Sequence, residues 1–101
     1  MSGEFTCSEE HQGYDRMVHG GILAAIVDAS MAQCLMGHGI AGYTTDLNLR
    51  YCKPVLINQP VTITTTLEDV NIGKLYTLKS IVVQYKQEAV KATGRFFKKG
   101  G

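Results

Sequence analysis

The residues of this sequence best suited to chemistry lie just before and within one apolar segment. Asp28 is the acidic residue of that segment, and a carboxylate in apolar surroundings carries a desolvation cost that hydrogen-bond donors must offset. His19, Gly20 and Gly21 come just before the apolar run. Glycines at a helix start allow close approach to the backbone, and the first N–H groups of the helix are free to bind an oxygen atom. The pattern therefore predicts a carboxylate and an oxyanion-binding helix start on one element.

Each half of this pattern also has a structural interpretation. Glycine near a helix start and histidine in a loop both occur for reasons of backbone geometry alone. Asp28 could face solvent, or it could accept a hydrogen bond from Ser30 or a neighbouring threonine. The coupling of a carboxylate with two glycines in one segment favours a functional site, and the structural alternative stays open.

The apolar segment predicts a buried helix over residues 19–36. Residues 21–36, GILAAIVDASMAQCLM, place apolar side chains on nearly every face, and the alanines favour helix. The following Gly37, His38 and Gly39 predict that the helix ends in a left-handed cap.

The spacing within this helix constrains the site. Gly20 and Asp28 are eight residues apart, which at about 1.5 Å per residue separates them by roughly 12 Å along the axis. They cannot both contact one substrate atom. Asp28 could, however, meet the helix start of a neighbouring chain if two such helices run antiparallel across a two-fold axis. The spacing therefore predicts a site shared between two subunits.

Most of the chain after the helix has the alternation of β-strands. In residues 43–51 the odd positions hold Tyr, Thr, Leu, Leu and Tyr, and they alternate with polar even positions, among which Thr44 falls. Further strands are predicted over residues 4–7, 61–70, 75–85 and 89–97. A connection over residues 86–88 joins the last two.

These elements predict an α+β fold in one domain spanning residues 1–101. The expected order is a strand, the helix and four strands in a meander, so that one antiparallel sheet wraps around one long central helix. A single sheet covers only one side of a helix that is apolar nearly all round. The uncovered side predicts self-association as a homodimer or a dimer of dimers.

Composition excludes several classes of partner. The formal net charge is +1, so no broad field attracts nucleic acid or a membrane surface. The cations Arg95, Lys98 and Lys99 form a short basic cluster that is typical of a solvated chain end, with phosphate contact as the alternative. The longest apolar stretch, residues 22–27, is too short to span a bilayer, and the first residues do not resemble a signal peptide. We expect a cytoplasmic protein.

Cysteine and histidine spacing predicts neither disulfides nor a metal site. Cys7, Cys34 and Cys52 are irregularly spaced and read as reduced thiols, with packing the preferred explanation for the last two and nucleophilic catalysis a remote alternative. His11 and His38 have no ligand-type partner at helical spacing. No metal and no cofactor is expected.

At this point the motifs carry a resemblance. HGGILAAIVDASMA, preceded by HQGYDRMV and followed by TTDLNLRYCKPV, resembles the hotdog-fold acyl-CoA thioesterases of the phenylacetate-pathway type, within the 4-hydroxybenzoyl-CoA thioesterase superfamily. The resemblance covers nearly the whole chain. Its strongest element is the His-Gly-Gly motif with an aspartate nine residues after the histidine, here His19 and Asp28.

The resemblance implies hydrolysis of an acyl-CoA thioester to the free acid and CoA. The Gly20 amide would polarise the thioester carbonyl, and Gly21 would lie in the substrate-binding loop. Asp28 would act from the partner subunit, either as nucleophile or as the general base that activates water. His19 would fix the loop rather than transfer protons. Thr44 matches a position where related enzymes use a small hydroxyl residue to hold water.

One departure from the family keeps other functions open. Related enzymes often carry an asparagine six residues before the histidine, where this chain has Gly13, and Gln12 beside it could supply the amide. Without that amide, a non-catalytic acyl-CoA-binding module becomes the alternative. A structural dimerisation domain and a hotdog dehydratase also remain, because fold alone does not choose chemistry. The sequence predicts no particular acyl group.

Overall fold

The structure is a computed structural model that describes residues 1–8, 12–14, 16–71 and 73–99, with the side chains of residues 12–14 outside that description. Its elements in chain order are β1 (Ser2–Thr6), β2 (Gln12–Tyr14), β3 (Met17–Val18), α1 (Gly20–Gly37), β4 (Gly42–Tyr51), β5 (Pro60–Asn71), β6 (Leu75–Gln84) and β7 (Gln87–Lys98). The predicted helix and the five predicted strands are present, with bounds shifted by at most two residues. The short β2–β3 ribbon was not predicted.

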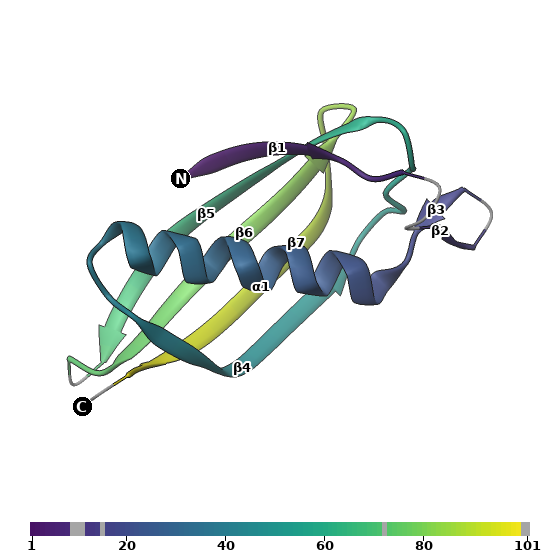
Figure 1. Ribbon diagram of the computed structural model, residues 1–101. Coiled ribbons are helices and arrows are strands. Elements are labelled where there is room, and N and C mark those ends of the chain that lie inside the picture. The colour runs from purple at the N-terminus through teal and green to yellow at the C-terminus, as the bar shows by residue number, and fades with distance from the viewer. Residues whose placement is uncertain (9–11, 15, 72, 100–101) are drawn as a thin grey trace.

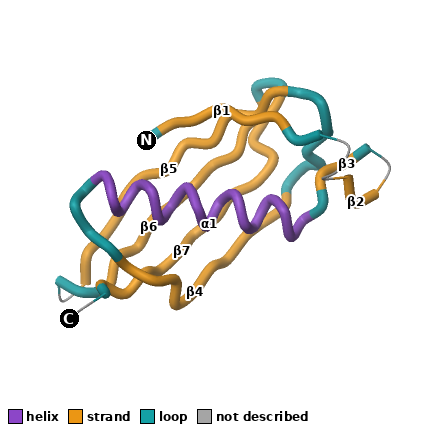
Figure 2. Tube along the Cα trace, in the orientation of Figure 1, coloured by secondary structure: helices purple, strands orange, loops and turns teal. Residues whose placement is uncertain are grey.

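Five strands form one sheet in the order β1-β5-β6-β7-β4, and every neighbouring pair is antiparallel. Figures 1 and 2 show α1 running across one face of this sheet, with β1 along one edge and β4 along the other. The predicted α+β class, an antiparallel sheet against one long helix, is confirmed.

The predicted four-strand meander is wrong for its first strand. β5, β6 and β7 are sequential neighbours, but β4 pairs with β7. Residues 52–59 therefore carry the chain from one side of the sheet to the other. Alternation along a strand shows which side chains share a face, but it carries no information on which strand lies beside it.

The turn between β6 and β7 is also shorter than predicted. It consists of Tyr85 and Lys86, whose φ angles are 53° and 61°, while Gln87 and Glu88 already belong to β7. Two-residue hairpins favour positive φ at both central positions because that twist matches the flanking strands.

The two ends of α1 follow the sequence signals. His19 is the N-cap, and its side chain accepts a hydrogen bond from the Gly21 N–H. At the other end, His38 donates to Leu35 and Gly39 donates to Met36, with Gly39 at a φ of 77°. The left-handed stop predicted from the glycines is confirmed.

One stripe of α1 packs against the sheet. The buried side chains of the helix are Leu23, Val27, Met31, Cys34 and Leu35, at the three- and four-residue spacing of a single helix face. Close packing there depends on the glycine of β7, Gly94, because a Cβ at that position would collide with the Met31 sulfur.

The rest of α1 is only partly covered by this chain. Ile22 and Ile26 are half-buried, and Met36 is 67% exposed. By length and composition α1 could cross a membrane, but core helices pass the same test and α1 packs on the sheet through the stripe just described. Length alone therefore does not exclude a membrane-spanning segment, contrary to the expectation from residues 22–27. The uncovered apolar side is the feature that predicted a second subunit.

A bulge in β4 decides which of its side chains face the helix. Thr44 pairs with Phe96 and Asp46 pairs with Arg95, so Thr45 has no partner of its own. Leu47 faces the helix, and strict alternation from it would turn Thr44 to the outer face. The extra residue reverses the alternation, and Thr44 shares the face of the buried Phe96. Regular alternation groups Thr44 with the other even-numbered residues of the strand on the outer face, and for Thr44 this prediction is wrong.

Candidate functional site

The Asp28 carboxylate has a hydrogen-bond donor from the sheet. The Thr44 hydroxyl donates to Asp28 Oδ1 over 2.6 Å, which joins the middle of α1 to the bulged part of β4. Asp28 is half-buried and Thr44 is exposed, so the carboxylate can be reached from outside this chain. A threonine was one of the partners expected if Asp28 has only a structural role. The threonine that binds it, Thr44, is also the one that the family resemblance indicates.

The start of α1 is held by its N-cap residue. The Gly21 N–H donates to His19 Nδ1 over 2.9 Å, and the Ile22 and Leu23 N–H groups donate to the His19 carbonyl. A neutral ring that accepts at Nδ1 carries its proton on Nε2. The His19 side chain is thus bound to the backbone of the first turn, and its role in fixing the loop stays a prediction.

The Gly20 N–H is the remaining donor of this first turn. Within the described part of the chain, no group accepts a hydrogen bond from it. It stands at the positive end of the α1 dipole, where an oxygen with developing negative charge is stabilised. Gly20 and Gly21 thus differ, because the Gly21 N–H already donates to His19 and the Gly20 N–H does not.

A residue that the sequence analysis missed completes the helix start. The Tyr51 hydroxyl donates to the Gly20 carbonyl over 2.9 Å. The ring lies against Gly20, since a Cβ built on that glycine would be 3.5 Å from the Tyr51 hydroxyl oxygen. The available signal was the place of Tyr51 at the end of the strand motif, on the same face as Leu47 and Leu49, which points toward the helix.

A hollow of about 300 Å³ opens beside Gly20. Its walls are largely apolar and include Met17, Leu23, Tyr51 and Val55, and Lys53 is the one charged residue among those that line it. A small apolar group of a ligand could occupy such a space next to the free N–H.

The structure does not bring all predicted site residues together. Asp28 and Thr44 form one group and His19, Gly20 and Gly21 form the other, and Asp28 does not line the hollow beside Gly20. The two groups are joined by two turns of one straight helix.

Gln12 and Gly13 lie in β2, whose backbone pairs with β3 just before His19. Their side-chain positions, and with them the question whether Gln12 supplies an amide, are outside the described residues.

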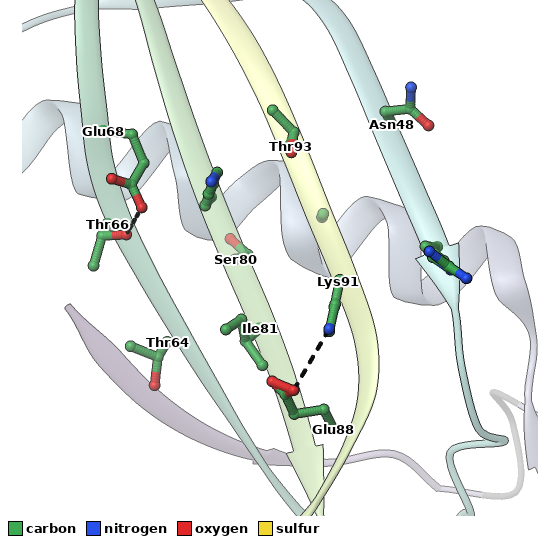
Figure 3. Close-up of a pocket in the computed structure, with 12 residues that line it drawn as sticks. Asn48, Thr64, Thr66, Glu68, Ser80, Ile81, Glu88, Lys91 and Thr93 are labelled. Carbon is green, nitrogen blue, oxygen red and sulfur yellow. Dashed lines mark hydrogen bonds and ion pairs between the residues drawn. The ribbon is translucent and has the colours of Figure 1, made fainter.

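Another hollow lies away from these residues. Figure 3 shows it on the outer face of the sheet, with α1 behind the strands, and its volume is about 530 Å³. Polar and charged side chains line it, and several pair with one another: Lys91 with Glu88 at 3.7 Å, and Thr66 with Glu68 at 3.3 Å. None of the predicted site residues lines this hollow.

The cysteines and histidines do not form a second site in the described part of the chain. Burial raises the pKa of the Cys7 thiol, which lowers its thiolate content. The packing explanation is confirmed for the buried Cys34 and wrong for Cys52, which is exposed. His38 is exposed at the end of α1, and His11 is outside the described residues. No three metal-ligating side chains converge among the described residues.

Residues 16–71 match the sequence profile of the Thioesterase superfamily. Acyl-coenzyme A thioesterase THEM4 of Mus musculus is 33% identical over 90 residues, covering 86% of this chain and 38% of THEM4. This chain thus spans well under half of the length of that curated relative.

Two solved structures show the same fold at lower identity. A hypothetical thioesterase of Streptococcus pneumoniae TIGR4, solved with coenzyme A, has a TM-score of 0.92 at 19% identity over 98% of this chain and 80% of its own. The E. coli PaaI protein of the phenylacetic acid degradation operon has a TM-score of 0.90 at 17% identity over 99% of this chain and 72% of its own.

The pneumococcal protein has also been solved as two variants, in which an aspartate and a threonine sixteen residues apart are each replaced by alanine. Asp28 and Thr44 are likewise sixteen residues apart. Because the profile match covers more than half of the chain and the structure superposes on solved thioesterases over nearly its whole length, the chain belongs to the thioesterase superfamily and has the hotdog fold.

Proposed function

We propose that this chain hydrolyses acyl-CoA thioesters to the free acid and CoA, in the cytoplasm, as a homodimer or a dimer of dimers. The observation that carries the proposal is the half-buried Asp28 carboxylate, held by Thr44 in the apolar helix of a thioesterase-superfamily fold. Support for the substrate comes from the name of THEM4 and from the coenzyme A in the pneumococcal structure.

The helix start supplies the oxyanion donor in this proposal. Water or a carboxylate adds to the thioester carbonyl carbon, and negative charge develops on the carbonyl oxygen. The Gly20 N–H, free of other acceptors in the described part of the chain, donates to that oxygen at the positive end of α1. The tetrahedral intermediate then collapses, the C–S bond breaks, and CoA leaves as a thiolate. If water added, the free acid is formed and the thiolate takes up the proton that Asp28 removed from that water. If the Asp28 carboxylate added, a mixed anhydride is formed, and a water molecule then cleaves it to the free acid, regenerates the carboxylate and supplies the proton for the thiolate.

Asp28 supplies the other half of the reaction from the partner chain. It is eight residues from Gly20 on one helix, so roughly 12 Å separates the two along the axis. Two α1 helices that run antiparallel, with their uncovered apolar sides together, would set each Asp28 opposite the Gly20 of the other chain. Thr44 holds Oδ1 and leaves Oδ2 to attack the carbonyl carbon or to remove a proton from water.

The first test is release of free thiol from a panel of acyl-CoAs by the wild type and Asp28→Ala. A loss of roughly 100-fold or more in turnover is expected, and equal rates would reject the proposal. The panel also identifies the acyl group.

The sharing of the site between chains has its own test, which mixes two inactive variants. Asp28→Asn lacks the carboxylate, and Gly20→Pro lacks the N–H. In a shared site, a dimer with one of each has one intact site, so a refolded equal mixture should recover roughly a quarter of wild-type activity. Sites contained within one chain would recover none.

A second candidate is a module that binds acyl-CoA without turnover. Gly13 favours it, because the family's usual amide is missing there. Calorimetric binding of acyl-CoAs across the panel, without release of thiol, would support this candidate over hydrolysis.

A further inference from the structure

We propose that Tyr51 is a positioning residue that fixes the oxyanion donor of the active site by holding the first peptide group of α1. This inference rests on the proposed function. It is carried by two hydrogen bonds: the Tyr51 hydroxyl donates to the Gly20 carbonyl, and the Gly21 N–H donates to His19 Nδ1, each over 2.9 Å.

The two bonds act on the same rigid unit. The Gly20 carbonyl and the Gly21 N–H are opposite ends of one planar peptide group. Tyr51 holds one end from the sheet, and His19 holds the other end from the loop. A peptide group fixed at both ends cannot rotate about its Cα–Cα axis. The Gly20 N–H belongs to the preceding peptide group, whose His19 carbonyl accepts from Ile22 and Leu23, so Tyr51 restrains the second of the two peptide groups that meet at the Gly20 Cα and limits movement of the donor between them.

Two consecutive glycines need such support. Glycine has the widest range of backbone angles, and the first turn of a helix frays most easily. The glycines bring the backbone close to a substrate, but without hydrogen bonds on both sides of Gly20 they would let its N–H change direction. An oxyanion donor is effective only if it already points at the place where charge develops. The Tyr51 bond supplies that direction without placing a side chain in front of the N–H.

The surroundings of Tyr51 argue against a purely packing role. The residue is 52% exposed, so it is not held in place by the core. Its hydroxyl is nevertheless bound to the backbone, and its ring forms part of the wall of the hollow beside Gly20. Tyr51 is the last residue of β4 and pairs with Val90, which ties the helix start to the sheet.

The main test replaces Tyr51 by phenylalanine, which keeps the ring and removes the hydroxyl. We expect kcat for acyl-CoA hydrolysis to fall about 3- to 10-fold, the range for loss of one neutral hydrogen bond, with KM unchanged. The matched control is Tyr43→Phe: Tyr43 is on the same strand and 55% exposed, but it contacts Phe97 instead of the helix start. This control should keep wild-type kcat.

A double variant tests whether Tyr51 acts through Gly20. In Gly20→Pro the donor is gone, so adding Tyr51→Phe should cost little more, whereas independent roles would multiply their effects. Amide hydrogen exchange of Gly21, followed by NMR, should be faster in Tyr51→Phe than in Tyr43→Phe.

The outcomes separate this inference from the proposed function. If the wild type releases no thiol from any acyl-CoA, the proposed function fails and the positioning role fails with it, whatever the exchange rates. If the wild type is active while Tyr51→Phe keeps wild-type kcat, or while the two substitutions multiply, the hydrolase stands and the positioning role is rejected.

Discussion

The two faces of the sheet carry different kinds of polar group. On the outer face, exposed side chains satisfy one another, as in the Lys91–Glu88 ion pair. On the helix face, Thr65 and Ser80 also pair with each other, but the Asp28 carboxylate held by Thr44 is half-buried and no described residue accepts from the Gly20 N–H. The hollow on the outer face is nevertheless larger, at about 530 Å³ against about 300 Å³ beside Gly20.

The proposed reaction therefore does not use the larger of these two hollows. Catalysis needs groups with unspent hydrogen-bonding capacity in fixed positions, because such groups can interact more strongly with the transition state than with the ground state. Mutually satisfied side chains in water offer little of that capacity. The following substitutions test this difference between the two faces.

The largest effect is expected at Asp28. Asp28→Asn keeps the shape and can still accept from Thr44, but it loses the charge and basicity. We expect kcat to fall by roughly 100-fold or more, while the unfolding temperature changes little. The matched control is Asp46→Asn, an exposed acidic residue of β4 opposite Arg95. A thiol-release assay gives kcat and thermal unfolding gives the stability of both variants. If Asp46→Asn lost as much activity as Asp28→Asn, the two faces of the sheet would not differ in the way proposed.

Nearly as large an effect is expected at Gly20, where proline removes only the N–H. Gly20 is the first residue of α1, a position where proline is well accepted, and His19 has the extended backbone (φ −59°, ψ 134°) that proline requires before it. Gly20→Pro should lower kcat by about 100-fold with the helix retained by circular dichroism. Gly20→Ala keeps the N–H, and its Cβ makes only ordinary contacts with Tyr51. If alanine lowers kcat as much as proline, space rather than the donor is the critical property.

A smaller effect is expected at Thr44. Thr44→Val removes the donor to Asp28 at nearly constant volume, and loss of one hydrogen bond to a charged group should lower kcat about tenfold. Thr44→Ser should restore most of it. Thr45→Val, next to it in the bulge, removes a hydroxyl that donates to the Arg95 carbonyl instead, and it should keep wild-type kcat. Equal losses at both positions would mean that the bulge, not the Asp28 contact, matters.

The position of Thr44 shows what the sequence could and could not predict about the site. The helix and its glycine stop follow from residues close together in the chain, and these predictions were confirmed. The direction of Thr44 depends on a bulge at an ordinary threonine. A period of two carries no signal for one inserted residue, so only the family resemblance placed Thr44 in the site.

Two further missed features are long-range. β4 lies beside β7 because of how the sheet closes over the helix, and no alternation pattern records that choice. The Tyr51–Gly20 bond joins residues 31 positions apart. Tyr51 looked like the end of a half-buried strand, and its function as a donor becomes visible only when strand and helix are seen together.

The smallest effect is expected on the outer face. Lys91→Ala removes the ion pair with Glu88. The Lys91 side chain is 57% exposed and the Glu88 side chain is 47% exposed. Exposed pairs contribute little, so the free energy of unfolding should change by less than about 1 kcal/mol and kcat by less than about twofold. Chemical denaturation and the thiol-release assay measure both quantities. A large fall in kcat at unchanged stability would mean that the outer hollow takes part in the reaction or in an assembly that the reaction needs. In that case, mutual pairing of exposed side chains would not indicate that a face of the sheet has no role in the reaction.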